Sequence, residues 1–132
     1  MYAADRASQH LGITIDGVGP GRAVARMGVT ETMINGHDLC HGGYLVLLAD
    51  TAFAFACNTY NRPTVAQGLD VTFLRPARLG DELVAEAGER SRRGRTGIYD
   101  VTVTRVTDGG PEVVAEFRGR SRELNGSIVD GA

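Results

Sequence analysis

The chain contains no lysine, so its fourteen basic residues are all arginines. Together with sixteen acidic residues they give a formal net charge of −2, which provides no electrostatic reason to expect nucleic acid or an acidic membrane as a partner. Any phosphate held by cations must therefore meet planar guanidinium groups, which bind phosphate oxygens through paired hydrogen bonds.

Cysteine and long apolar runs are also scarce. Only Cys40 and Cys57 are present, so we expect no disulfide framework and a reducing, cytoplasmic location. No apolar run approaches the roughly 20 residues of a membrane-spanning helix. The opening residues MYAADRASQHLG lack the apolar segment of a signal peptide, so we expect no membrane partner.

The length of 132 residues predicts a single domain over residues 1–132. Alternating apolar residues between glycine-rich turns indicate its strands. Two strands are expected within residues 13–30, and four more follow in residues 64–74, 81–91, 96–106 and 112–124.

Two helices are expected as well. Residues 2–10 predict a short helix, and residues 43–58 predict a long one that is apolar on nearly every side and therefore buried. Residues 30–41 are expected to form a loop, and residues 125–132 a loose tail. One buried helix and about six mostly antiparallel strands indicate the α+β class, with a curved sheet wrapped around the helix.

A single carboxylate, Asp50, interrupts the apolar stretch of the long helix. Burying a charge is unfavourable unless it is paired, hydrogen-bonded or neutralised. One explanation is structural, with Asp50 capping a backbone amide or meeting an arginine. The other is a general base or nucleophile in a dry pocket, where loss of solvent raises the pKa of the carboxyl. The local sequence leaves both explanations open.

Two glycines, Gly42 and Gly43, stand where the loop enters this helix. A helix start offers unpaired N–H groups, and glycine lets a substrate approach the backbone, so the pair is a candidate oxyanion site as well as a sharp turn. Eight residues separate Gly42 from Asp50, which is about 12 Å of helix rise and too far for both to act on one atom. We therefore expect a dimer in which the two groups of a site come from different chains.

The stretch HDLCH contains possible zinc ligands in His37, Cys40 and His41, with Asp38 as an oxygen ligand. Its spacing matches no regular metal motif, so we expect no metal and assign the histidines to shaping the loop. Cys40 and Cys57 are possible nucleophiles, but inert buried thiols are the favoured interpretation.

Four segments resemble the hotdog-fold acyl-CoA thioesterases, and among them the phenylacetyl-CoA thioesterase group: NGHDLCHGGYLVLLADTAFAFACN, VTFLRPARLGDELVAEA, RTGIYDVTV and FRGRS. The resemblance implies an antiparallel sheet around a central helix, and subunits that join edge to edge as a homodimer or a dimer of dimers with active sites between chains. It implies that Asp50 is the catalytic carboxylate, that the Gly42 N–H polarises the thioester carbonyl, that Asn35 lies near that carbonyl or the attacking water, and that His41 orients the site.

The resemblance also implies contacts to the substrate from Gly43, Gln67 and arginines. The candidates for binding the nucleotide end of coenzyme A are Arg93 and Arg95 in an arginine-rich turn, Arg75 beside Pro76, and Arg120 on the last strand. Solvated turns and strand faces explain such arginines equally well. The expected activity is hydrolysis of phenylacetyl-CoA or a ring-hydroxylated relative, with coenzyme A as part of the substrate and no separate cofactor. The alternatives are a thioesterase for other aryl or medium-chain acyl-CoA esters, a hydratase, and a non-catalytic acyl-CoA-binding module.

Overall fold

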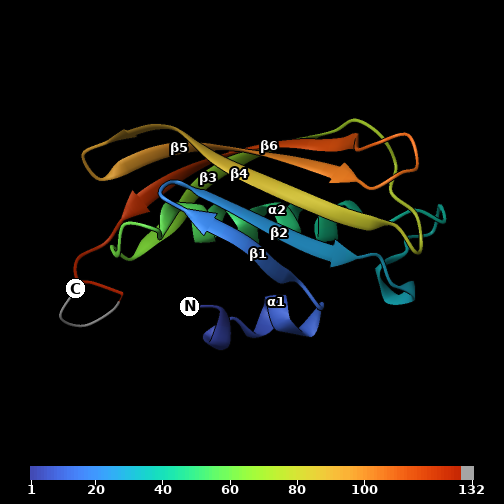
Figure 1. Cartoon of the computed structure of the whole chain (residues 1–132), viewed down its shortest axis with the longest axis horizontal. Helices are drawn as coiled ribbons and strands as arrows, with labels where there is room; N and C mark the ends of the chain where they lie inside the picture. Colours follow the sequence, from blue (N-terminus) through green and yellow to red (C-terminus); the bar gives the residue numbers. More distant parts are fainter. Residues whose placement is uncertain (129–132) are drawn as a thin grey trace.

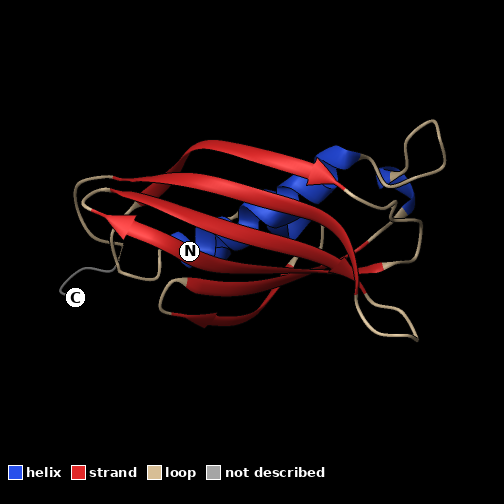
Figure 2. Ribbon diagram, turned by 90° about the horizontal axis from the view of Figure 1, so that it is seen from above, coloured by secondary structure: helices blue, strands red, loops and turns tan. Residues whose placement is uncertain are grey.

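The structure is a computed structural model that describes residues 1–128. Six strands form one antiparallel sheet, with the long helix against its concave face (Figures 1 and 2). This confirms the predicted α+β class and curved sheet. From one edge to the other the strands are β1 (Thr14–Gly19), β2 (Arg22–Gly28), β4 (Glu82–Arg93), β5 (Thr96–Arg105), β6 (Glu112–Glu123) and β3 (Thr64–Phe73).

Helix α2 (Gly42–Cys57) is held to the middle of the sheet by Phe53. The Phe53 ring centroid lies 5.6 Å from that of Tyr99 and 5.8 Å from that of Phe117. A Cβ atom built on Gly119 of β6 would lie only 2.7 Å from the Phe53 ring, so only glycine lets the strand pass over the ring at this distance. This contact fixes where the helix begins relative to the sheet.

The N-terminal helix differs from the prediction for residues 2–10. It consists of a 3₁₀ turn, η1 (Tyr2–Ala4), and a helix, α1 (Arg6–His10), with Asp5 between them as the N-cap of α1. The Asp5 carboxylate accepts the Ser8 N–H at 3.0 Å, which satisfies one of the donors at the helix start and restarts the chain in a new direction.

The remaining connections hold smaller departures. The loop expected over residues 30–41 contains a 3₁₀ turn, η2 (Glu31–Met33). Of the tail expected over residues 125–132, residues 129–132 lie outside the described part, and the Ile128 N–H donates to Asn61 Oδ1 at 3.1 Å. None of the helices in residues 1–128 combines the length and apolar character that crossing a membrane requires.

Strand β3 forms an open edge of the sheet with an unusually exposed surface. Val65 and Phe73 are 46% and 51% exposed, and the pairing of β3 with β6 is interrupted by a bulge at Gln67. An edge strand offers unpaired backbone N–H and C=O groups to another chain unless something blocks it. The β3 edge is therefore one of the two edges of the described sheet at which a second strand could pair.

Candidate functional site

The start of α2 leaves one backbone donor without an acceptor. The His41 N–H donates to Met33 O at 2.7 Å, and His41 Nδ1 accepts the Gly43 N–H at 2.9 Å as the helix cap. The Tyr44 N–H donates to His41 O at 3.0 Å. The Gly42 N–H has no acceptor within residues 1–128. The predicted oxyanion donor is thus available, whereas the Gly43 N–H is occupied while His41 caps the helix.

The Phe73 ring lies directly over Gly42. A Cβ atom on Gly42 would be 2.8 Å from the tip of the ring, so any larger residue here would push the half-exposed Phe73 ring aside. Beside the ring is a mainly apolar pocket of about 450 Å³. Its lining residues are Asn35, Leu39, Cys40, Gly42, Leu45, Phe73, Leu74, Arg75, Pro76 and Ala77. The structure therefore brings together three predicted site residues, Asn35, Gly42 and Arg75.

The orientation of the Asn35 amide is set by the loop. Its Oδ1 accepts the His37 N–H at 2.9 Å and the Leu39 N–H at 3.2 Å, which closes the loop before the helix. Because the oxygen is engaged, the amide NH₂ is the group left for other partners, and it has none in the described chain. Asn35 is thus a fixed hydrogen-bond donor at the pocket.

Asp50 lies about two turns further along α2. The half-buried carboxylate makes neither a hydrogen bond nor an ion pair with any residue in the part of the chain that the structure describes. The structural explanation for Asp50, a capped amide or an arginine partner, therefore has no support. Burial raises the pKa of Asp50 above its ordinary value of 3.8, and the negative charge of Asp5 raises it further.

Asp50 is absent from the lining of the pocket at Gly42. The helix is continuous over residues 42–57, so the eight intervening residues hold the two groups about 12 Å apart along its axis. One chain therefore presents two separate unsatisfied groups, a backbone donor at Gly42 and a carboxylate at Asp50.

The other predicted contacts are dispersed. Gln67 occupies the bulge of the β3 edge and is exposed. Arg75 donates to Val113 O at 2.9 Å at the rim of the pocket. Arg120 crosses Gly68 on the outer face of the sheet and pairs with Asp70 at 3.0 Å.

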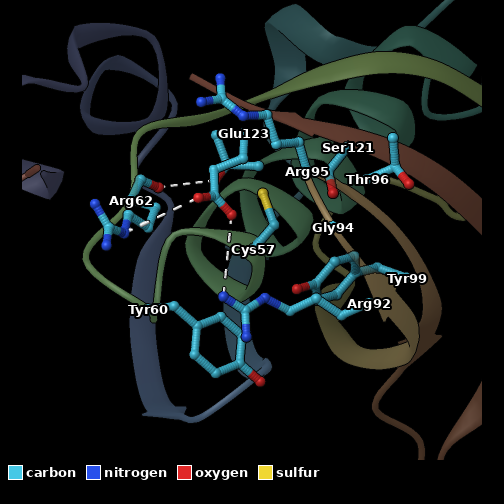
Figure 3. A pocket seen from close by; sticks show the side chains of 11 residues that line it. Cys57, Tyr60, Arg62, Arg92, Gly94, Arg95, Thr96, Tyr99, Ser121 and Glu123 are labelled. Atoms are coloured by element: carbon cyan, nitrogen blue, oxygen red, sulfur yellow. Dashed lines mark hydrogen bonds and ion pairs between the residues drawn. The ribbon is translucent and has the colours of Figure 1, made fainter. Parts of the chain in front are cut away.

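The turn between β4 and β5, which carries Arg93 and Arg95, lies at the opposite end of α2 from Gly42. Figure 3 shows this end, where Glu123 stands between the guanidinium groups of Arg62 and Arg92 at 4.0 Å from each. The hollow among these side chains has only about 10 Å³, so it admits no substrate. The guanidinium groups of Arg93 and Arg95 form no ion pair or hydrogen bond within residues 1–128.

The cysteines are protonated thiols at neutral pH. Burial raises the pKa of Cys40, with a smaller contribution from the charge of Asp81, and burial raises the pKa of Cys57 to about 12. Neither thiol therefore has the thiolate character of a nucleophile. In the stretch HDLCH, His37 and Asp38 are exposed while Cys40 is buried, and no three His, Cys, Asp or Glu side chains of the described chain are grouped as metal ligands.

Sequence reasoning missed Phe73. A phenylalanine near the end of a strand resembles any other core residue, and its contact with Gly42 joins segments 31 residues apart. The alternation of the strand could have predicted its position. Side chains two residues apart lie on the same face, so Phe73 shares the face of Leu69 and Val71, which pack against the core.

Replacing Asp50 with Asn should stabilise the fold at pH 7. The folded state raises the pKa of Asp50, so ionisation opposes folding, and wild-type stability falls as the pH rises through 3.8 and then through the folded-state value. Urea unfolding at fixed protein concentration should show the Asn variant more stable at pH 7 and equal to wild type below pH 3.8.

Asp108→Asn removes an exposed carboxylate from the turn between β5 and β6 and serves as the matched control. A pH-independent difference between wild type and Asp50→Asn, or a less stable Asn variant at pH 7, contradicts the unpaired state of Asp50.

Comparison with known proteins shows the family of the chain. The chain is 43% identical to the acyl-coenzyme A thioesterase PaaI of Escherichia coli (strain K12) over 132 residues, which are 100% of this chain and 92% of that protein. The structure of the E. coli PaaI protein from the phenylacetic acid degradation operon superposes with a TM-score of 0.92 at 43% identity, covering 98% of this chain and 91% of that chain.

A mutant of the phenylacetic acid degradation protein PaaI from Thermus thermophilus gives a TM-score of 0.83 at 35% identity, covering 89% of this chain and 98% of that chain. The thioesterase superfamily profile matches residues 37–112, which include the Gly42 turn, Asp50, the β3 edge and the arginine turn. The chain therefore belongs to the thioesterase superfamily and has its hotdog fold.

Proposed function

We propose that the protein hydrolyses acyl-CoA thioesters to a free acid and coenzyme A. The observation that supports this best is the pair of unsatisfied groups on α2, the Asp50 carboxylate and the Gly42 N–H, in a thioesterase-superfamily chain with 43% identity to an acyl-coenzyme A thioesterase. A carboxylate without a partner destabilises the fold, and thioester hydrolysis is the chemistry that explains its retention.

The proposed mechanism uses the chain's own groups. The Gly42 N–H at the positive end of the α2 dipole binds the thioester carbonyl oxygen and stabilises the negative charge that develops there, and the Asn35 NH₂ donates nearby. Asp50 either takes a proton from the attacking water or attacks the carbonyl carbon to form a mixed anhydride that water then cleaves. In both routes the thiolate of coenzyme A leaves. The proposed mechanism needs neither a metal nor a redox cofactor.

The active unit is proposed to be a homodimer, or a dimer of dimers, with sites between chains. The 12 Å helix rise between Gly42 and Asp50 supports this arrangement, as does the exposed β3 edge beside the pocket. A two-fold axis would give each site the Gly42 turn of one chain and the Asp50 of the other. The unpaired thiols of Cys40 and Cys57 fit a reducing, cytoplasmic location.

An aryl acyl group, phenylacetyl or its ring-hydroxylated form, fits the half-pocket best. Phe73, Leu74 and Leu45 give an apolar wall with one aromatic face next to the proposed carbonyl site, where a substrate ring stacks favourably. The two PaaI relatives carry phenylacetic acid degradation in their descriptions. Other aryl or medium-chain acyl groups remain the alternative, because a partner chain completes the pocket.

Initial rates on a panel of aryl and alkyl acyl-CoA esters test the function directly. Wild type should hydrolyse phenylacetyl-CoA with the highest kcat/KM, and Asp50→Asn should lower kcat by about 10²-fold or more while remaining folded, since a positioned base contributes about that much. A folded Asn variant with normal kcat removes Asp50 from the mechanism. A straight-chain preference redirects the substrate assignment only.

Mixing two inactive variants tests whether sites are shared. Gly42→Pro removes the N–H at the first helical position, where proline is tolerated, and His41 before it already has the extended φ −60° and ψ 133° that proline favours. Mixed with Asp50→Asn under subunit exchange, it should restore activity, because each hybrid dimer regains one intact site.

Gly42→Ala is the matched control for this experiment, since it places the same Cβ against Phe73 but keeps the N–H. The difference between the Ala and Pro variants isolates the donor. No recovery after proven exchange means that both groups of a site come from one chain.

Arg93 and Arg95 are proposed to bind the phosphates of coenzyme A. They are exposed, their guanidinium groups form no ion pair within the described residues, and no lysine competes for the role. Replacing both with Ala should raise KM for the CoA ester and leave kcat nearly unchanged, because distant phosphates contribute uniform binding. The effect should shrink with salt and vanish for an N-acetylcysteamine thioester.

Arg118 and Arg90, which share Asp100 on the outer face, supply a double-Ala control of equal charge change. Equal KM changes for the full and truncated esters would indicate a folding defect in the Arg93 and Arg95 variant and would remove these arginines from phosphate binding.

A further inference from the structure

The N-terminal segment lies against the helix that carries Asp50. Figure 1 shows α1 below α2, on the side of the helix away from β4, β5 and β6. The Tyr2 ring centroid is 6.4 Å from that of Phe55, and the Tyr2 hydroxyl donates to Ile13 O. Leu11 packs against the core that Ile13 enters completely. The N-terminal segment is thus packed firmly against the helix that carries Asp50.

Three side chains link the segment to α2 through hydrogen bonds. The Asp5 Oδ2 accepts the Ser8 hydroxyl at 2.7 Å, and the Ser8 and Thr51 oxygens are 2.9 Å apart. An ionised carboxylate only accepts hydrogen bonds, so Ser8 must give its single proton to Asp5. Thr51 therefore donates to Ser8. The direction of these two hydrogen bonds, from Thr51 to Ser8 and from Ser8 to Asp5, follows from the charge on Asp5.

This polar chain is placed where most of the packing is apolar. Ser8 is 1% exposed and Thr51 is 7% exposed, and they are two of the three buried polar side chains within residues 1–128. A buried network that is fully satisfied fixes one arrangement of the elements it joins. Here it fixes the carboxylate of Asp5 relative to Thr51, the residue that follows Asp50 on the helix.

Asp5 is also the charged side chain that acts on Asp50. The elements packed against α2 are α1 and the six strands, and across the described residues Asp5 is the charged group whose field reaches Asp50. On the helix itself, the charge of Asp50 contributes to the raised pKa of the Cys57 thiol, which stays neutral. Within residues 1–128 no arginine is among the groups that shift the pKa of Asp50. Asp5 and burial act in the same direction, and both raise the pKa of Asp50.

We propose that Asp5 is a positioning residue of the site, a second carboxylate that does not react. The hydrogen-bonded chain through Ser8 and Thr51 holds its negative charge near Asp50 and makes Asp50 a stronger base. The inference rests on the proposed role of Asp50 in hydrolysis. A stronger base accepts a proton from water more readily, provided that the pH keeps it ionised.

The test is the pH dependence of kcat/KM for Asp5→Asn in the full chain. Asn keeps an N-cap oxygen for the Ser8 N–H, so α1 is retained while the charge is lost. The acid limb of the profile should move to lower pH, and the displacement from wild type should shrink as salt rises. Asp5→Ser, a second neutral N-cap residue, should move the limb in the same direction.

Asp108→Asn changes net charge equally at a distant exposed turn and should leave the limb in place. Ser8→Ala removes the hydrogen bonds that link Asp5 to Thr51 but keeps the Asp5 charge. It should displace the acid limb less than Asp5→Asn does. An unmoved limb in both Asp5 variants overturns the proposal, whether the plateau stays normal or falls, because a purely structural role lowers the plateau alone.

A direct titration separates this inference from the function itself. The ¹³C carboxyl resonance of Asp50, assigned by its loss in Asp50→Asn, should titrate at lower pH in Asp5→Asn than in wild type. This measurement needs no turnover. If Asp50→Asn retains full activity, the proposed mechanism fails while the titration still reports on Asp5; if the resonance does not move, the Asp5 proposal fails alone.

Discussion

The packing of Phe53 against Gly119 is the contact on which the rest of the structure depends. It sets α2 at one height on the concave face of the sheet. Everything at the helix start follows from that height, because the His41 cap, the loop closed by Asn35 and the ring of Phe73 converge on Gly42. A helix displaced by one residue would rotate Asp50 by about 100° and separate it from the face beside α1.

The apolar surroundings of α2 serve stability and reactivity in opposite directions. They drive burial of the helix, and they deprive Asp50 of solvent and of any partner in the described chain. The fold therefore carries an unfavourable ionised group that a neutral amide would relieve. A reactive role for Asp50 explains why this loss of folding stability is retained, since active sites commonly lower stability in favour of function.

The sequence was sufficient for the long helix and the six strands, because each shows in local periodicity, and for singling out Asp50 on an apolar helix. It left open whether Asp50 has a partner, which only the structure decides. It was insufficient where a distant partner decides. Propensity alone favoured one helix over residues 2–10, whereas Asp5 caps a separate helix α1 through the Ser8 N–H. The position of α1 on α2 depends on Ser8 meeting Thr51, 43 residues away. The fate of the Gly43 N–H depends on the rotamer of His41. The position of Phe73 over Gly42 depends on the register of β3 beyond its bulge. The His41 cap is local but depends on a rotamer, and the contacts of Ser8 and Phe73 join distant segments, so composition encodes none of them.

The rigidity of α2 makes assembly and chemistry depend on the same edge of the sheet. No side-chain rotation closes the roughly 12 Å that the helix rise places between Gly42 and Asp50. The open edge, β3, carries Phe73 beside Gly42 and Gln67 in its bulge. A second chain that pairs with β3 arrives next to the half-built pocket, and a two-fold axis exchanges the two carboxylates between the two pockets. Separated chains keep a donor without a base and a base without a donor. In the proposed mechanism, association is therefore a condition for the reaction, and the exposed β3 edge is the surface proposed for it.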